Sequence, residues 1–295
     1  MPNTAIARAA FWMAGWLLLM VVIAVAGREA TRELTVFQVM LMRSTLGLVM
    51  LWPLIHRAGG LAAMRSERMP LHVGRNIVHY AAQYGWFAAL SLIPLAQLVA
   101  IEFTMPIWSA LLAAAMLGER LNRARIAAVV LGLAGVLVIV RPDAAHINLG
   151  QWIALAAALG FGISVVLIKS LTRTDAAIQI SFWMLVVQSI IGVIPALAVW
   201  QWPSASGWGW VLLVAFCGTY SHYCLARAME LADATVVVPM DFLRVPFTAL
   251  AGWALYAERV DLLTLAGMAL ILAGNGLNLV RAGGQDTDQR PAKNI

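Results

Sequence analysis

The chain has 295 residues, of which 62% are hydrophobic and 12% charged, with a mean hydropathy of +0.84. A soluble domain has about 45–50% apolar and about 25% charged residues, so this composition excludes a soluble domain and predicts a polytopic membrane protein. The net charge of +6 does not indicate nucleic acid as a partner, because the cations lie in short loops between apolar runs, as membrane topology requires.

Ten apolar runs approach the ~20 residues that a helix needs to cross a bilayer. They cover residues 9–27, 36–55, 71–91, 95–117, 124–140, 149–168, 176–199, 208–229, 234–256 and 262–280. The first run follows Arg8 as in a signal peptide, but its length favours a membrane span. Cys217 and Cys224 share one run, which argues against a disulfide framework or a thiolate metal site, and we expect no cofactor and no metal.

The distribution of Lys and Arg predicts the orientation in the membrane. Fourteen of the 20 cations lie in segments on the same side as the N-terminus, four lie in the opposite loops, and Arg43 and Arg244 lie within spans. Because cytoplasmic loops carry the excess of Lys and Arg, both termini are expected in the cytoplasm. The expected location is a bacterial inner membrane, with the lipid bilayer around a multi-pass chain.

A shift of 139 residues carries spans three to five onto spans eight to ten without a gap. The matches are Glu102-Phe103 with Asp241-Phe242, Glu119-Arg120 with Glu258-Arg259, and Ala134-Gly135 with Ala273-Gly274. Charged residues match as well as apolar ones, which argues against similarity by composition alone. We therefore expect an all-α membrane protein of ten transmembrane helices in two five-helix repeats, residues 1-143 and 144-295. Five is odd, so the second repeat is inverted, an architecture typical of secondary carriers.

Two corresponding spans carry polar and aromatic side chains that could bind a substrate. These candidates are His79, Tyr80, Gln83 and Trp86 in span three, and His222 and Tyr223 in span eight. His79, Gln83 and Trp86 are spaced i, i+4, i+7 and share one helix face, which is expected to line a cavity. The alternative is hydrogen bonding between helices without substrate contact, which is common in membranes.

Three ionisable residues within spans complete the candidate binding site. Ionisable side chains inside the bilayer are costly, so they usually indicate a binding site or a pathway for a substrate or an ion. Asp241 and Arg244 are three residues apart and are expected to form a fixed ion pair. Glu102 has no cation close in sequence, so we expect it to bind a substrate ammonium group or a coupling proton. Arg43 in span two is a candidate partner that would instead make Glu102 structural.

Two segments resemble the EamA-type members of the drug/metabolite transporter superfamily. They read FQVMLMRS, which contains Arg43, and LIPLAQLVAIEFTMPIWSALLAAAMLGERLNRARIAAVVLGLAGVLVIVRP. The resemblance implies ten spans in two inverted halves and export of amino acids or related metabolites. Residues 9–27 lack the acidic residue that small multidrug relatives carry in their first span, which argues against their proton-for-drug mechanism.

The predicted function is therefore a secondary transporter, an exporter that moves amino acids, including aromatic and apolar ones, or related small metabolites by alternating access. A carrier for a nucleoside-like cofactor or a drug is the alternative. A membrane-embedded enzyme is disfavoured, because HExxH, GxSxG and glycine-rich phosphate motifs are missing from the sequence. A channel is disfavoured by the inverted repeat.

Overall fold

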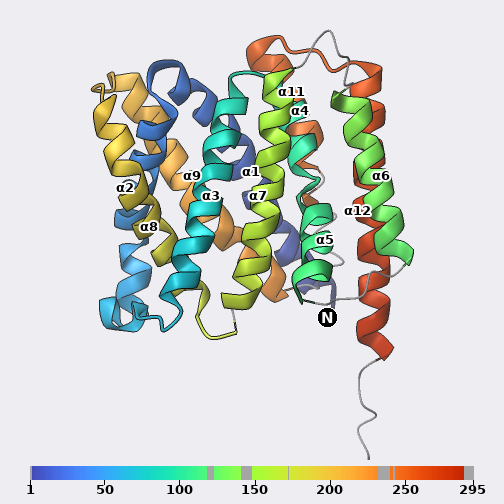
Figure 1. The fold of residues 1–295 in the computed structure, drawn as a ribbon, viewed down its shortest axis with the longest axis horizontal. Helices are drawn as coiled ribbons and strands as arrows, with labels where there is room; N and C mark the ends of the chain where they lie inside the picture. Colours follow the sequence, from blue (N-terminus) through green and yellow to red (C-terminus); the bar gives the residue numbers. More distant parts are fainter. Residues whose placement is uncertain are drawn as a thin grey trace, which may run out of the picture.

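The computed structural model describes residues 2–117, 123–140, 148–171, 173–231, 240–241 and 243–288, and within these ranges every regular element is a helix. The helices are α1 (Pro2–Glu33), α2 (Val36–Arg57), the short η1 (Gly60–Met64), α3 (Met69–Leu90), α4 (Leu95–Glu102), α5 (Met105–Leu117), α6 (Arg123–Val140), α7 (Leu149–Leu171), α8 (Ala177–Ala198), α9 (Ala205–Leu231), α11 (Arg244–Tyr256) and α12 (Leu262–Asp288). They stand side by side, with α2 and α8 along one lateral edge of the bundle and α6 and α12 along the opposite edge (Figure 1).

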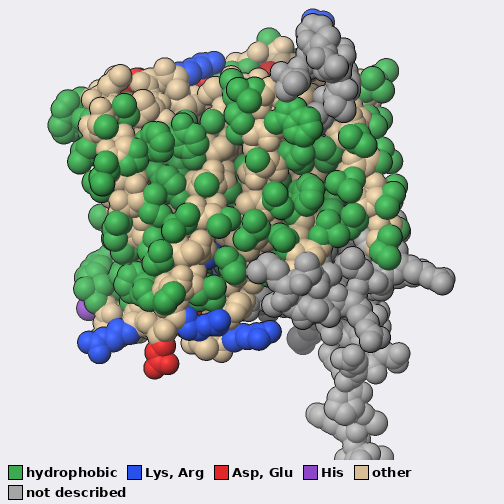
Figure 2. Space-filling model, in the orientation of Figure 1, with side chains coloured by type: hydrophobic (Ala, Val, Ile, Leu, Met, Phe, Trp, Pro, Cys, Tyr) green, Lys and Arg blue, Asp and Glu red, His purple; other side chains and the backbone are tan. Residues whose placement is uncertain are grey.

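The outside of the bundle is apolar, as a surface in contact with lipid must be. Large side chains such as Ile194, Phe11 and Val49 are exposed. Figure 2 shows hydrophobic side chains over most of one face, with Lys and Arg along its lower edge. Among the described residues, α1, α2, α7 and α8 contain stretches long and apolar enough to span a bilayer. The prediction of an all-α polytopic membrane protein is confirmed.

The helices pack in pairs that relate the two repeats. α1 packs against α9, α3 against α7, α2 against α8, α4 against α11, and α6 against α12. Exchanging the two repeats places α1 where α7 is and α9 where α3 is, so the α1–α9 pair takes the place of the α3–α7 pair. The same exchange carries each of the other three pairs onto itself. This is the contact pattern of a pseudo-two-fold axis between inverted halves. The predicted boundary at residues 143 and 144 lies outside the described residues and stays a prediction.

Span four was expected as one helix over 95–117, and this is wrong. It consists of α4, which ends at Glu102, and α5, which begins at Met105. The Thr104 carbonyl accepts from the backbone N–H groups of Ile107 and Trp108, which starts α5 as a new helix. Pro106 fits in the first turn of α5, where its missing N–H costs no helical hydrogen bond.

The corresponding place in the second repeat also carries a helix start, since α11 begins at Arg244. α4 lies inside the bundle, with Leu95, Leu98 and Ile101 fully buried. The break after Glu102 therefore places a carboxylate in the interior of the protein. Interrupted helices at this depth are where secondary carriers bind substrates and ions.

Loops predicted on the same side of the membrane meet at the same end of the bundle. At one end Arg28 contacts the carbonyl of Ile93, and Glu33 contacts Ser204. At the other end Arg68 contacts Ser170. Figure 1 shows the start of α1 and the end of α12 at a common, lower end. The start of α1 and the end of α12 therefore lie on the same side of the bundle.

Reporter fusions should assign the two ends of the bundle. We expect a fusion at Ala62 or Gln285 to report the cytoplasm and one at Ser204 to report the periplasm. Most Lys and Arg residues lie in the loops on the side of Ala62 and Gln285, and cytoplasmic loops carry the excess of cations. The measurement is reporter activity in whole cells, with protein amounts matched by immunoblotting. Ala62 and Ser204 on the same side would contradict the ten-span topology.

Candidate functional site

An ion pair between the two interrupted helices forms the centre of the candidate site. Arg244 Nη1 lies 2.9 Å from Glu102 Oε1, and both side chains are largely buried. Glu102 is the last residue of α4 and Arg244 the first of α11. A helix dipole disfavours a carboxylate at the C-terminus and a cation at the N-terminus, so each residue alone would be unfavourable at its helix end. Paired, they neutralise each other and join the two repeats.

Two tryptophans and a second carboxylate surround this pair. Trp86 of α3 donates from Nε1 to Glu102 Oε2 at 2.8 Å, and Trp16 of α1 donates to Asp241 Oδ1 at 2.6 Å. Arg244 Nε lies 3.6 Å from the same oxygen of Asp241. The guanidinium thus faces both repeated carboxylates, and each carboxylate accepts from an indole. Aromatic rings with polar edges beside a charge can bind a ring-bearing, charged or polar molecule.

The structure corrects two expectations about these charges. Glu102 was expected without a nearby cation, or with Arg43 as its partner, but its cation is Arg244 from the second repeat. Arg43 instead faces Gln83. Asp241 and Arg244 do approach each other, but the closer carboxylate of Arg244 is Glu102. A span-by-span reading could not find this pairing, because Glu102 and Arg244 are 142 positions apart in the sequence.

The predicted face of span three points into the bundle. Gln83 fits with its amide oxygen toward Arg43, at 3.0 and 3.2 Å from Nη1 and Nη2, and its nitrogen 2.9 Å from Gln188 Oε1. His79 Nδ1 lies 3.2 Å from the Ser164 hydroxyl, and Tyr80 is buried. These side chains contact other helices, so their role in substrate binding stays a prediction. The side chains of His222 and Tyr223 lie outside the described part of the chain.

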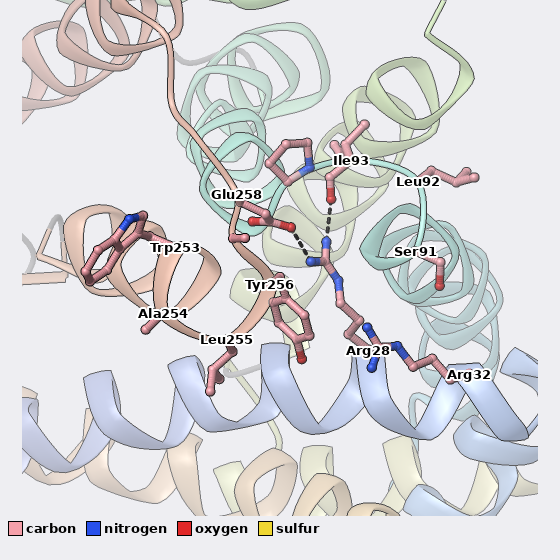
Figure 3. Close-up of a pocket in the computed structure, with 12 residues that line it drawn as sticks. Arg28, Arg32, Ser91, Leu92, Ile93, Trp253, Ala254, Leu255, Tyr256 and Glu258 are labelled. Atoms are coloured by element: carbon pink, nitrogen blue, oxygen red, sulfur yellow. Dashed lines mark hydrogen bonds and ion pairs between the residues drawn. The ribbon is translucent and has the colours of Figure 1, made fainter.

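A second polar cluster closes the end of the bundle nearest α4 (Figure 3). Arg28 of α1 donates to the carbonyls of Leu90 and Ile93 and pairs with Glu258. Glu258 also accepts from the backbone N–H of Leu95 at 2.9 Å and so caps α4. The residues border a cleft of about 790 Å³. Seven residues of helix, ~10 Å, separate Leu95 from Glu102, so this cleft is distinct from the central ion pair.

The model of the EamA-like transporter family matches the chain twice, over residues 7–141 and 148–280. The chain belongs to the EamA-like transporter family. Both halves carry the family's pattern, in agreement with the paired helix packing. The EamA-like chain is therefore a multi-pass membrane protein and a transporter of small metabolites.

Individual relatives differ in the cargo that their names give. The chain is 32% identical to a riboflavin transporter of Rhizobium johnstonii over 73% of this chain and 72% of the relative. It is 22% identical to an S-adenosylmethionine uptake transporter of Rickettsia bellii (88% and 90%) and 26% identical to a pseudopaline exporter of Pseudomonas aeruginosa (83% and 86%). A crystal structure with a TM-score of 0.66 and 20% identity, over 95% of this chain and 99% of that one, shows the same fold. These names support metabolite transport without singling out amino acids.

Sequence reasoning missed several buried polar residues of this EamA-like transporter. Trp16 was read only as part of an apolar run, although an indole in mid-span needs a hydrogen-bond partner. Arg75 was counted as a loop cation, but it is buried in α3. Arg28, also counted in a loop, is buried against Glu258. The two arginines lie within two turns of a helix end, where sequence alone does not separate a loop from a buried turn.

At the opposite end of the EamA-like fold, Asp175 joins the loops. Its carboxylate lies 2.6 Å from His72 Nε2 and accepts from the hydroxyl of Ser66. Burial acts to raise the pKa of Asp175, but hydrogen bonds from Ser66, His72 and Thr174 outweigh it and hold this pKa below its ordinary value. The ionised form of Asp175 therefore stabilises the folded protein.

Replacing Asp175 with asparagine should lower the melting temperature at neutral pH, and the difference should shrink in acid. Because the folded-state pKa lies below the unfolded value of about 3.9, this contribution is complete above that value and is lost as the pH falls through the folded pKa. Thermal unfolding in detergent between about pH 7 and about pH 3 measures it. Glu67→Gln, at an exposed carboxylate, is the control. A loss that stayed constant with pH would contradict the ionised contact.

Proposed function

We propose that this chain is a secondary carrier that moves a small, ring-bearing metabolite across the bacterial inner membrane by alternating access between its two repeats. The observation that carries the proposal is the Glu102–Arg244 pair, which joins the interrupted helices of the two repeats and is held by Trp86. Since a carrier must couple cargo binding to movement of one repeat against the other, a charged contact between them is a suitable binding point. Both termini lie in the cytoplasm in this proposal.

The favoured cargo class is a cofactor of the riboflavin or nucleoside type. Two riboflavin transporters, 32% and 31% identical over most of their lengths, support this class. The indoles of Trp16 and Trp86 at the central charges suit a flat, heteroatom-rich ring, which can stack on an aromatic face and accept hydrogen bonds at its edge.

Amino acids, including aromatic and apolar ones, are the second candidate. Their ammonium group fits the carboxylates of Glu102 and Asp241, and their side chain fits beside the tryptophans. This candidate follows from the charges of the site and from the family resemblance. The names of relatives include both uptake and export, so the expected export is tested together with the cargo.

Transport by the purified protein in liposomes tests the proposal. Labelled riboflavin, S-adenosylmethionine, tryptophan and leucine are offered separately, inside or outside, with and without a proton gradient. We expect saturable flux of at least one ring-bearing solute, and competition from unlabelled compounds then ranks the classes. Flux in only one direction of the proton gradient would identify the coupling proton. Absence of flux for all four solutes would overturn the proposed cargo classes.

Trp86→Phe links this flux to the site. The substitution keeps an aromatic ring but removes the N–H that donates to Glu102, so we expect lower flux with little change in protein amount. Trp202→Phe, at a highly exposed tryptophan, is the matched control and should transport as the wild type does. Equal flux in the two variants would separate the central pair from transport.

A further inference from the structure

Two arginines are buried in the bundle with no carboxylate beside them among the described side chains. Arg43 of α2 and Arg75 of α3 are 4% and 3% exposed. The hydrogen bonds of Arg43 go to the Gln83 amide, and those of Arg75 go to Ser164 and Asn76. Arg75 lies about two turns before Gln83 on α3, and Gln83 contacts Arg43. Within the part of the chain whose side chains are described, neither forms an ion pair.

The carboxylates of the described interior are already engaged elsewhere. Glu102 and Asp241 face Arg244, Asp175 faces His72, and Glu258 faces Arg28. Two buried cations that have no counter-ion among the described residues are unfavourable. Residues of this kind fit a protein that takes up a negative charge during its working cycle.

Neighbouring polar atoms point to the same chemistry. Arg43 Nε, the Tyr80 hydroxyl and Gln188 Nε2 are buried and have no hydrogen-bond partner among the residues that the structure describes. They belong to one region, because Gln83 contacts both Arg43 and Gln188, and Tyr80 lies one turn before Gln83 on α3. All three can donate, and buried donors without acceptors are costly. Among the described side chains, this region therefore has more donors than acceptors and no carboxylate. We call Arg43, Arg75, Tyr80, Gln83 and Gln188 the donor cluster.

We propose that the donor cluster binds an oxyanion of the cargo, a carboxylate or a phosphate. This inference rests on the proposed carrier function and narrows its substrate class. A guanidinium pairs with two oxygens of either group, and a bound oxyanion would balance the positive charge of Arg43 and Arg75. In the structure the Gln83 amide oxygen occupies the acceptor position at Arg43. A charged oxygen is the stronger acceptor and displaces it.

The inference predicts which cargo is favoured. Riboflavin is uncharged, whereas its 5′-phosphate carries a phosphate and S-adenosylmethionine and amino acids carry a carboxylate. The ring part of such a molecule would extend from the donor cluster toward Trp86, which lies one turn beyond Gln83 on α3. Both the charge and the ring then have partners on the same helix.

Thermal unfolding of the purified protein in detergent tests anion binding without relying on transport. The probes are sodium phosphate and sodium acetate at up to ~50 mM, with chloride holding the ionic strength constant, and riboflavin compared with its 5′-phosphate. We expect a saturable rise in melting temperature with an oxyanion and a larger rise for the phosphorylated flavin than for riboflavin. A response to phosphate alone or to acetate alone identifies which oxyanion the site prefers.

Four variants locate the response. Arg43→Gln and Arg75→Gln should abolish it, whereas Arg65→Gln, at an exposed arginine, should leave it unchanged. Gln83→Glu places a carboxylate against Arg43, so it should raise the melting temperature and remove the response to added anion. If either arginine variant fails to fold, the melting temperature and anion response of Gln83→Glu still test whether the donor cluster binds an oxyanion.

The outcomes separate this inference from the proposed function. An unresponsive wild type, or a Gln83→Glu protein that is less stable and still responds, would overturn the oxyanion site. Metabolite flux in liposomes together with an unresponsive wild type would leave the carrier function and remove only this site. An anion response without flux of any tested solute would instead count against the proposed carrier function.

Discussion

Replacing Arg244 with glutamine should abolish transport and destabilise the protein more than substitution of an exposed arginine. The change removes the cation that Glu102 and Asp241 share, so both buried carboxylates are left without a counter-ion at this site. Removal of one partner from a buried ion pair costs about 3–5 kcal/mol, because the remaining charge is uncompensated. It also removes the contact of the guanidinium with the Phe103 ring, 4.7 Å away. Liposome flux and thermal unfolding in detergent measure the two effects.

A second substitution distinguishes the loss of charge balance from the loss of packing. Glu102→Gln combined with Arg244→Gln removes both charges, so we expect it to recover part of the stability but none of the transport. Arg259→Gln, at an exposed arginine of the same repeat, is the control. If Arg244→Gln were as stable as this control, the two carboxylates would have another partner.

Replacing Arg28 with glutamine should loosen the end of the bundle shown in Figure 3. Arg28 joins α1 to the carbonyls of Leu90 and Ile93 and to Glu258, which caps α4. The substitution strands the Glu258 carboxylate and frees two carbonyls, so a loss of about 3–5 kcal/mol in the free energy of unfolding is expected. Flux should also fall, because this end can no longer close firmly. Thermal unfolding and liposome flux provide the measurements.

The neighbouring arginine supplies the comparison for this cluster. The Arg32 side chain is 61% exposed and pairs with Glu29 on the same helix. Arg32→Gln should therefore lower the free energy of unfolding by no more than about 1 kcal/mol, the usual contribution of a surface ion pair. Glu258→Gln should resemble Arg28→Gln, and the double variant should lose less than the two single losses added together. Additive losses would mean that the two residues act separately.

The features that depend on local chain properties could be predicted from the sequence. Apolar runs gave the membrane spans, and the spacing of Asp241 and Arg244 gave their approach on one helix turn. The repeat was visible because charged residues recur at a fixed shift. Glu102 was correctly placed inside a span, since its backbone continues an apolar segment whose Leu98 and Ile101 are buried.

Features that depend on contacts between distant segments could not be predicted from the sequence. The pairing of Glu102 with Arg244 requires α4 and α11 to meet, which no spacing within a span determines. The break between α4 and α5 was missed because the run 95–117 is apolar on both sides of Glu102, and Pro106 alone does not distinguish a kink from a new helix. Arg75 was misplaced because a buried cation beside Ser164 has the same local sequence as an exposed one.

Arg244 has no counterpart in the first repeat, since the shift of 139 residues carries it onto Met105. In a carrier built from inverted repeats, exchanging the conformations of the halves turns an inward-facing state into an outward-facing one. Identical halves would give these two states equal free energies. A cation in only one half removes that degeneracy, and a difference of about 1.4 kcal/mol already favours one state tenfold. Under the proposed carrier mechanism, the empty protein therefore has a preferred resting state, and cargo must bind the other state more tightly to shift the equilibrium.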